Sequence, residues 1–427
     1  MLEPLLQKVR NREEVVCVLG LGRVGLPLAS VFASSGVKLI GIDNNLERLD
    51  SIRKAKCPFF DPPLQENLEK AIQSGNLKVE DDLKKVINDI DIIFVTVGTP
   101  KNSENSIDYS QLYGALDSIC TGDIQGKLIV MRSTMAPNTT VEIVIPFLEH
   151  KTGKKAGQDF AVVVCPERIL EGRAVQELQE LPEIIGSTND ICREIATELF
   201  RKINHKKDIL YTTPSGAELA KLFTNIYRYI SFALSNEFAI WAESYGQDAT
   251  ELIKIANYNY PRSKIPIPGF VGGPCLSKDG NFLDNNTTFS SIVSTAWKLN
   301  ESIPQHIMNN IKKLTGPLFG KKITVLGISF KAGSDDVRNS PSAKLVELLK
   351  GTGAEVSIHD PYVKKTLSLS DALKSPEVTI IATNHKEFLD KIEDIRKSES
   401  KIIYDVWGMF EKTDFPDSNY IKFGQGN

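Results

Sequence analysis

The chain has 427 residues, a formal net charge of −3, 41% apolar residues and 25% charged residues. At about 150 residues per domain, this length predicts about three domains of an ordinary globular protein. The charge gives no reason to expect nucleic acid or an anionic membrane as a partner, and no apolar run reaches the ~18 residues of a membrane span. Six cysteines lie scattered without paired spacing, which favours a reducing cytoplasm and predicts neither a disulfide framework nor a metal site.

The first elements read as a dinucleotide-binding unit. Apolar residues at helical spacing predict a short amphipathic helix over residues 2–9. A buried strand over residues 15–19 then runs into Gly20-Leu21-Gly22-Arg23-Val24-Gly25 and a helix to about Ser35. A second strand, residues 37–42, ends at Asp43, 18 residues after the third glycine. Strand, glycine turn, helix and acid in this order predict a Rossmann site, in which the acid favours NAD over NADP.

Further strands over residues 91–97, 127–131 and 160–164 each end in a polar or turn-rich segment. In an open α/β sheet these carboxyl ends border the ligand crevice, and the alternation of strand and helix to about residue 205 predicts a doubly wound domain. Glu167 and Glu171 follow the last of these strands. A carboxylate there can act as a general base or position a water, or it can simply place charge at a helix N-terminus.

A long helix is predicted over residues 215–245, which contain no proline and only one glycine. Such a helix between two domains often serves as a linker and a dimerisation surface. Glu218, Lys221 and Asn225 share one of its faces. They form either an exposed polar stripe or, for the lysine and the asparagine, donors to an oxyanion. A second helix is predicted over residues 249–257.

Cys275 stands in Gly272-Gly273-Pro274-Cys275-Leu276-Ser277-Lys278-Asp279. Glycines allow close approach to a ligand, and the lysine could favour the thiolate. A nucleophilic thiol together with a hydride-accepting cofactor suggests oxidation of a carbonyl through a thioester. The remaining cysteines are expected in the core.

A third domain begins near residue 321, with strand, glycine, a helix over residues 342–351 and a strand over residues 355–360. It lacks GxGxxG, so we expect it to bind something other than the dinucleotide. Lys331 and Arg338 suit a diphosphate, although such loops are often solvated charge runs. His385, at a strand end, is expected to be structural. The fold class is therefore α/β, with two Rossmann-like doubly wound domains joined by a long central helix, and with boundaries at 1–205, 206–315 and 316–427.

These motifs, with Val97-Gly98-Thr99-Pro100, Ser133-Thr134, Pro166-Glu167-Arg168, Ala217-Glu218-Leu219-Ala220-Lys221 and Phe330-Lys331, occur together in one order. Over nearly its whole length the chain resembles the UDP-glucose/GDP-mannose dehydrogenases, the nucleotide-sugar 6-dehydrogenases. The resemblance implies oxidation of a sugar C6 alcohol through the aldehyde to the carboxylate with two NAD. It implies a thiohemiacetal and then a thioester on Cys275.

The resemblance also implies roles for individual residues. Lys221 and Asn225 would stabilise the oxyanion, Asp279 would assist the water or Lys221, Glu167 would act as acid/base and Thr134 would help to hold the water. We expect the cofactor to contact Gly20, Gly22, Arg23, Val24, Gly25, Asp43, Arg48, Thr99, Ser133, Thr134, Glu171, Lys278 and Arg338. We expect the UDP-sugar to contact Glu167, Arg168, Leu170, Glu171, Lys221, Asn225, Arg262, Pro268, Phe270, Gly272, Phe330 and Lys331. Arg262 resembles an arginine that often reaches a neighbouring subunit, which favours a homodimer.

Departures from the family pattern leave the sugar open. Arg23 stands where the family usually has an aromatic residue. Tyr260-Pro261-Arg262 and the loop around Phe270 resemble members that act on N-acetylated sugars, whereas Lys278-Asp279 is typical of the UDP-glucose enzymes. We favour UDP-N-acetyl-mannosamine or UDP-N-acetyl-glucosamine and keep UDP-glucose as the alternative. A two-electron hydroxyacid-type dehydrogenase and a non-catalytic sugar-nucleotide sensor are the rival classes.

Overall fold

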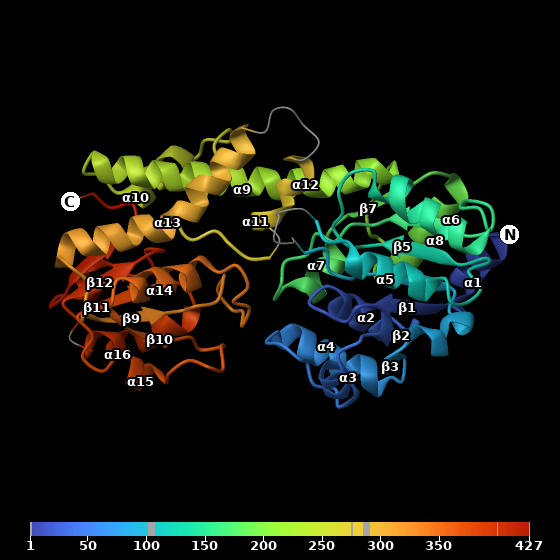
Figure 1. Cartoon of the computed structure of the whole chain (residues 1–427), viewed down its shortest axis with the longest axis horizontal. Helices are drawn as coiled ribbons and strands as arrows, with labels where there is room; N and C mark the ends of the chain where they lie inside the picture. Colours follow the sequence, from blue (N-terminus) through green and yellow to red (C-terminus); the bar gives the residue numbers. More distant parts are fainter. Residues whose placement is uncertain (1, 101–106, 275, 285–290, 399, 427) are drawn as a thin grey trace. The chain divides into compact units, whose positions relative to one another are not determined.

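The structure, a computed structural model, describes residues 2–100, 107–274, 276–284, 291–398 and 400–426. They form two compact units, residues 1–223 with 281–285 and residues 224–280 with 286–427. Both units contain a mainly parallel sheet with helices, and the long helix α9 (Pro214–Ser244) contributes to each of them (Figure 1). The predicted fold class is confirmed, and the three domain boundaries remain predictions.

The first unit contains an eight-stranded sheet in the order β3-β2-β1-β4-β5-β6-β7-β8. Neighbouring strands run parallel except β6 and β7, which are antiparallel. Its strands are β1 (Val15–Leu19), β2 (Lys38–Ile42), β3 (Leu77–Glu80), β4 (Ile92–Val95), β5 (Leu128–Met131), β6 (Ala161–Val164), β7 (Glu183–Ser187) and β8 (Ile209–Thr212).

Helices cover both faces of this sheet, because alternate residues of each strand point to opposite sides. Val16 and Val18 of β1 belong to one apolar core, and Cys17 and Leu19 belong to the other. The expected helix at the start is present as α1, which buries Leu5 and packs on α8. Besides the start of α9, the α-helices of this unit are α1 (Glu3–Asn11), α2 (Gly25–Ser34), α3 (Leu46–Arg53), α4 (Pro62–Gln73), α5 (Ser110–Ile119), α6 (Ile145–Thr152), α7 (Ala174–Glu180), α8 (Asp190–Arg201) and the short α12 (Asn281–Asp284).

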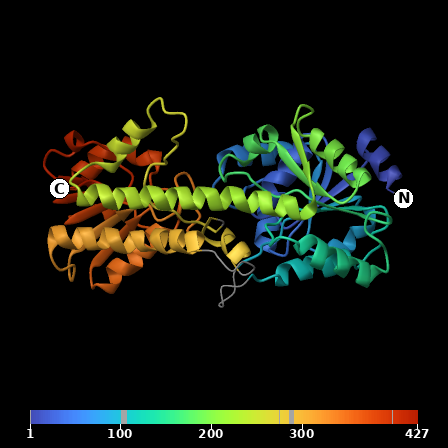
Figure 2. The same cartoon turned by 90° about the horizontal axis from the view of Figure 1, so that it is seen from above.

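The second unit has a five-stranded parallel sheet in the order β10-β9-β11-β12-β13. Its strands are β9 (Lys322–Leu326), β10 (Glu355–His359), β11 (Val378–Ile381), β12 (Ile402–Asp405) and β13 (Asn419–Lys422), and the helices packed around it include α14 (Pro341–Gly351), α15 (Leu369–Ala372) and α16 (Ile392–Arg396). The same unit holds α10 (Ala249–Asn257) and α11 (Leu276–Asp279). In Figure 2, α13 (Ser291–Thr315, orange) lies beside α9 (green), and buried asparagines on the two helices are hydrogen-bonded.

Candidate active site

The glycine turn after β1 has the shape that a dinucleotide needs. Gly20 has a φ of +99°, a conformation that L side chains rarely adopt. A Cβ on Gly25 would lie 1.8 Å from the carbonyl oxygen of Gly20, so only glycine lets α2 start so close to the turn. A Cβ on Gly22 would meet no atom of the described chain within 4 Å. The turn therefore leaves its backbone open for the close approach of a pyrophosphate at a helix N-terminus.

Asp43 closes the second strand beside this turn and is buried. Its Oδ2 accepts hydrogen bonds from Leu21 N and from Arg48 Nη1, both at 2.7 Å, and its Oδ1 accepts from Asn45 N at 2.9 Å. These donors hold the carboxylate in place next to the glycine turn. The two expected cofactor residues, Asp43 and Arg48, are thus brought together as an ion pair.

Arg23 is tied down on two sides. Its guanidinium forms an ion pair with Glu171 and lies over the ring of Phe59, 4.7 Å from the ring centroid. Gly172 N donates to Asp61 Oδ2 at 3.2 Å, so the loop of Glu171 is also joined directly to the segment of Phe59 and Asp61. The guanidinium of Arg23 is therefore engaged by the protein and is not simply solvated. Arg23 instead connects the glycine turn to the loop of Glu171.

The ends of β4 and β5 meet as the sequence predicted. Ser133 Oγ donates to the carbonyl oxygen of Val97 at 2.7 Å, and Thr99 Oγ1 donates to the carbonyl oxygen of Thr134 at 2.7 Å. The segments that carry Thr99, Ser133 and Thr134 are therefore joined at one edge of the sheet, where a ligand crevice is expected.

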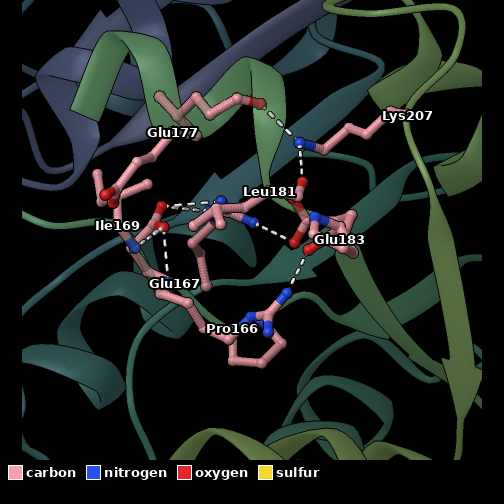
Figure 3. Close-up of a pocket in the computed structure, with 11 residues that line it drawn as sticks. Pro166, Glu167, Ile169, Glu177, Leu181, Glu183 and Lys207 are labelled. Atoms are coloured by element: carbon pink, nitrogen blue, oxygen red, sulfur yellow. Dashed lines mark hydrogen bonds and ion pairs between the residues drawn. The ribbon is translucent and has the colours of Figure 1, made fainter. Parts of the chain in front are cut away.

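Glu167 is held in a buried charge cluster that the sequence analysis missed (Figure 3). Arg132 Nε donates to Glu167 Oε2 at 2.8 Å, and Arg132 Nη1 donates to Glu183 Oε1 at 2.8 Å. The other oxygen of Glu167 accepts from the backbone N–H groups of Arg168 at 2.7 Å and Ile169 at 2.9 Å. Both oxygens of this carboxylate are thus engaged by donors from the described chain.

The charges of this cluster compensate one another. Burial alone would lower the pKa of Arg132, but the carboxylates of Glu167 and Glu183 outweigh it and raise that pKa. Burial raises the pKa of Glu183, although Arg132 opposes the shift, and burial lowers the pKa of Lys207. Lys207 Nζ donates to the carbonyl oxygens of Leu178 and Leu181, each at 2.6 Å. A pocket is lined by these side chains with Pro166, Arg168, Ile169, Glu177 and Pro182 (Figure 3).

On α9, the three polar residues of one face have different partners. Glu218 accepts from Thr140 N at 3.0 Å and from Thr140 Oγ1 at 2.7 Å, so it anchors the segment after β5. Lys221 is buried. Asn225 Nδ2 donates to Asp279 Oδ2 at 2.6 Å, and Asp279 is fully buried. The reading of an exposed polar stripe is therefore wrong for Glu218 and Lys221.

The segments on either side of Cys275, the predicted nucleophile, are packed closely. Pro268, Phe270 and Gly272 are buried, and Lys278 Nζ lies 3.9 Å from Asp279 Oδ1. Cys275 itself lies outside the described residues. Arg262 is exposed, and its guanidinium donates to the hydroxyl of Tyr260 and lies over that ring. Leu170 is also exposed.

The loop after β9 carries the basic residues expected to meet a diphosphate. Lys331 Nζ lies 5.9 Å from the ring centroid of Phe330. Arg338 makes a two-pronged pair with Asp336, with Nε 2.9 Å from Oδ1 and Nη2 2.6 Å from Oδ2. The expected residues therefore fall into two sets. The expected site residues from Gly20 to Lys221 belong to the first unit, and those from Asn225 to Arg338 belong to the second.

Asp360 and His385 are hydrogen-bonded to the backbone of the loop after β9. Asp360 Oδ2 accepts from Ile328 N at 2.8 Å, from Ser329 N at 3.0 Å and from His385 Nε2 at 3.1 Å. Gly333 N donates to His385 Nδ1. Serine, histidine and aspartate do not form a catalytic triad here, because Ser329 and Asp360 both meet Nε2 and His385 is fully buried. The structural role predicted for His385 is confirmed.

Replacing Asp360 by asparagine is expected to destabilise the second unit at neutral pH. Burial would raise the pKa of Asp360, but its hydrogen bond to His385 and the backbone donors lower it to about 2. A depressed acid stabilises the fold above its unfolded pKa of about 3.9, and this contribution disappears as the pH falls towards 2. The expected difference is about 2 kcal/mol at pH 7, shrinking below pH 4.

Urea unfolding followed by tryptophan fluorescence measures this difference, because Trp241, Trp297 and Trp407 all belong to the second unit. Exposed Asp390 changed to asparagine is the control and should alter the unfolding free energy by less than about 0.5 kcal/mol. Equal losses for Asp360→Asn at pH 3 and pH 7 would contradict the assigned ionisation.

Comparison with known proteins assigns the family. Residues 14–204 match the model of the UDP-glucose/GDP-mannose dehydrogenase family NAD binding domain, residues 215–303 match its central domain and residues 324–412 match its UDP binding domain. The chain belongs to the UDP-glucose/GDP-mannose dehydrogenase family. It is an NAD-dependent UDP-sugar dehydrogenase, and the glycine turn beside Asp43 fits the cofactor of that family.

Relatives cover nearly the whole chain. A UDP-N-acetyl-D-mannosamine dehydrogenase of Pyrococcus horikoshii is 35% identical over 91% of this chain and 94% of its own length. A UDP-N-acetyl-D-mannosamine dehydrogenase of Campylobacter jejuni is 32% identical over 89% of this chain and 97% of its own length. A solved structure from Pyrococcus horikoshii superposes with a TM-score of 0.90 at 34% identity, over 96% of this chain and 99% of the other. The solved structure of a UDP-N-acetyl-mannosamine dehydrogenase from Staphylococcus aureus superposes with a TM-score of 0.86 at 32% identity, over 96% of this chain and 98% of the other.

Proposed function

We propose that this enzyme oxidises the C6 alcohol of a UDP-N-acetylhexosamine, UDP-N-acetyl-mannosamine before UDP-N-acetyl-glucosamine, to the uronate with two NAD. The curated relatives at 35% and 32% identity are named for the mannosamine substrate, which supports the N-acetylated sugar over the UDP-glucose alternative. The uronate would supply synthesis of a surface polysaccharide or glycan.

The reaction centre that we propose is built around Cys275. Its thiolate adds to the C6 aldehyde to form a thiohemiacetal, loss of hydride gives a thioester, and water releases the carboxylate and the thiolate. NAD supplies the hydride acceptor for both oxidations. Lys221 and Asn225 donate to the oxyanion of the tetrahedral species. The observation that carries this assignment is the 2.6 Å hydrogen bond from Asn225 to buried Asp279, because it fixes the carboxamide beside the segment of Cys275.

Two carboxylates of the first unit also have proposed roles. Glu167 acts as acid/base towards the water that Thr134 helps to hold, and Glu171 lies between cofactor and sugar. The ion pair of Glu171 with Arg23 supports that location, since Arg23 belongs to the glycine turn. Arg168, Leu170, Pro268, Phe270, Gly272, Phe330 and Lys331 would contact the UDP-sugar, and Val24, Lys278 and Arg338 the cofactor.

We further propose a cytoplasmic homodimer in which Arg262 reaches the neighbouring subunit. Large apolar side chains are exposed along α9 and α10, as a surface that pairs with a second copy requires, namely Phe223, Tyr227, Leu234, Trp241, Leu252 and Ile255. Separately, no helix in the described part of the chain combines the length and apolar character needed to cross a bilayer. A solution mass of one chain would contradict the dimer.

A panel of UDP-sugars with NAD tests the proposal. UDP-N-acetyl-mannosamine is expected to give two NADH per sugar, with kcat/KM at least about tenfold above that for UDP-glucose, because a site that hydrogen-bonds an N-acetyl group rejects the sugar that lacks it. Absorbance at the NADH band measures both quantities. One NADH per sugar would indicate the two-electron class, no NADH with any sugar would indicate a sensor, and preference for UDP-glucose would overturn the choice of sugar.

A further inference from the structure

Two adjacent residues of α9 hold the loop of residues 266–272 by its backbone. Ser235 Oγ donates to the carbonyl oxygen of Pro266, and Gly269 N donates to Asn236 Oδ1 at 2.9 Å. Ser235 and Asn236 are both fully buried. One contact satisfies a backbone acceptor and the other a backbone donor three residues later, so the pair fixes both the position and the direction of the loop on the helix.

The orientation of Asn236 is in turn fixed by Asn300 of α13. Asn236 Nδ2 donates to Asn300 Oδ1 at 3.0 Å, and Asn300 Nδ2 donates to the carbonyl oxygen of Tyr229 at 3.3 Å. The chain of hydrogen bonds starts at the Gly269 N–H, which can only donate, and ends at a carbonyl, which can only accept. Neither amide can therefore turn over without placing two like groups against each other.

The opposite side of the loop is also confined. A Cβ on Gly269 would lie 2.7 Å from the ring of Trp407, and a Cβ on Gly272 would lie 2.4 Å from Pro341 Cδ. Gly273 N donates to the carbonyl oxygen of Asn339 at 3.0 Å. The loop is thus packed between α9 and the region around α14 and β12, and it has little room to shift.

We propose that Asn236 and Asn300 are positioning residues for sugar-nucleotide binding, acting through the 266–272 loop and not on the cofactor. This inference rests on the proposed contact of Pro268, Phe270 and Gly272 with the UDP-sugar. Both asparagines are buried and hydrogen-bonded to one another and to backbone, so their effect passes through the loop.

Asn236→Asp and Asn300→Asp test the relay with nearly unchanged volume. In each variant one carboxylate oxygen keeps an existing hydrogen bond, while the other faces an oxygen, of Asn300 or of Tyr229. We expect the Kd for UDP, measured by calorimetry, and the KM for the sugar nucleotide to rise about tenfold, which is the effect of losing one buried hydrogen bond. The Kd for NADH and the kcat at saturation should stay within about twofold.

Two variants of α13 serve as controls. Asn309→Asp makes the same chemical change at an exposed site and should alter nothing. Ile307→Val removes a methyl group from the apolar core of the second unit, so it should lower the unfolding temperature without weakening the binding of UDP. If both aspartate variants behave like Ile307→Val, the proposal is wrong. Should Asn236→Asp fail to fold, Asn300→Ala carries the same test. UDP as the probe keeps the result independent of the sugar, so a failed substrate panel with a positive UDP result would reject only the proposed function.

Discussion

Replacing Cys275 by serine is expected to lower the steady-state rate of uronate formation by at least about a thousandfold. A serine hydroxyl is not ionised at neutral pH and cannot form the thioester from which water releases the product. Binding should survive, because the sulfur-to-oxygen change removes no charge that holds UDP. Product formation is measured by chromatography of the uronate, and the Kd of the sugar nucleotide is measured separately.

Cys120→Ser is the matched control, since it makes the same atomic change at a partly buried thiol of the first unit. Burial raises the pKa of Cys120, and it raises that of Cys192 to about 11 and that of Cys165 well above the ordinary value. These thiols are poor nucleophiles at neutral pH, so Cys120→Ser should keep full activity. Undiminished uronate production by Cys275→Ser would rule out the covalent route.

Arg132→Met is expected to destabilise the first unit by about 3–5 kcal/mol, because it leaves Glu167 and Glu183 buried without their shared cation. Arg132→Lys should recover only part of this loss, since one ammonium cannot reproduce the fork that reaches both carboxylates and the carbonyl of Cys165. Circular dichroism during heating or urea titration measures the change.

Arg53→Met provides the contrast, because its ion pair with Asp50 is exposed and should be worth less than about 1 kcal/mol. If Arg132→Met does not fold, adding Glu167→Gln and Glu183→Gln removes both stranded charges and should restore a folded chain. Equal stability of Arg132→Met and Arg53→Met would mean that the buried cluster does not hold the fold.

The regular elements could be predicted because local pattern decides them. The strand of residues 15–19 and the helix of residues 249–257 agree with β1 and α10 at both ends. The reversal of β7 against β6 could not be predicted, since a fully buried strand such as Glu183–Ser187 has the same composition in either direction.

The candidate site was predicted where residue type and backbone motif coincide. The glycine turn and Asp43 have the expected geometry, but Arg132 was overlooked although it follows an apolar strand, a place where a charge is informative. Asn236 and Asn300 gave no signal, because they are 64 positions apart and only the packing of α9 on α13 brings them together. A pair of polar residues buried by tertiary packing has no periodicity of its own.

The aspartate at the end of the second strand is used differently by the two sheets. Asp43 and Asp360 each accept an N–H from the turn after the first strand, but Asp360 is also engaged by His385. In the second sheet, the carboxylate that would bind a ribose is therefore already hydrogen-bonded within the protein. We therefore expect NAD to bind at the first sheet only, whereas the second sheet lies in the region that matches the family's UDP binding domain.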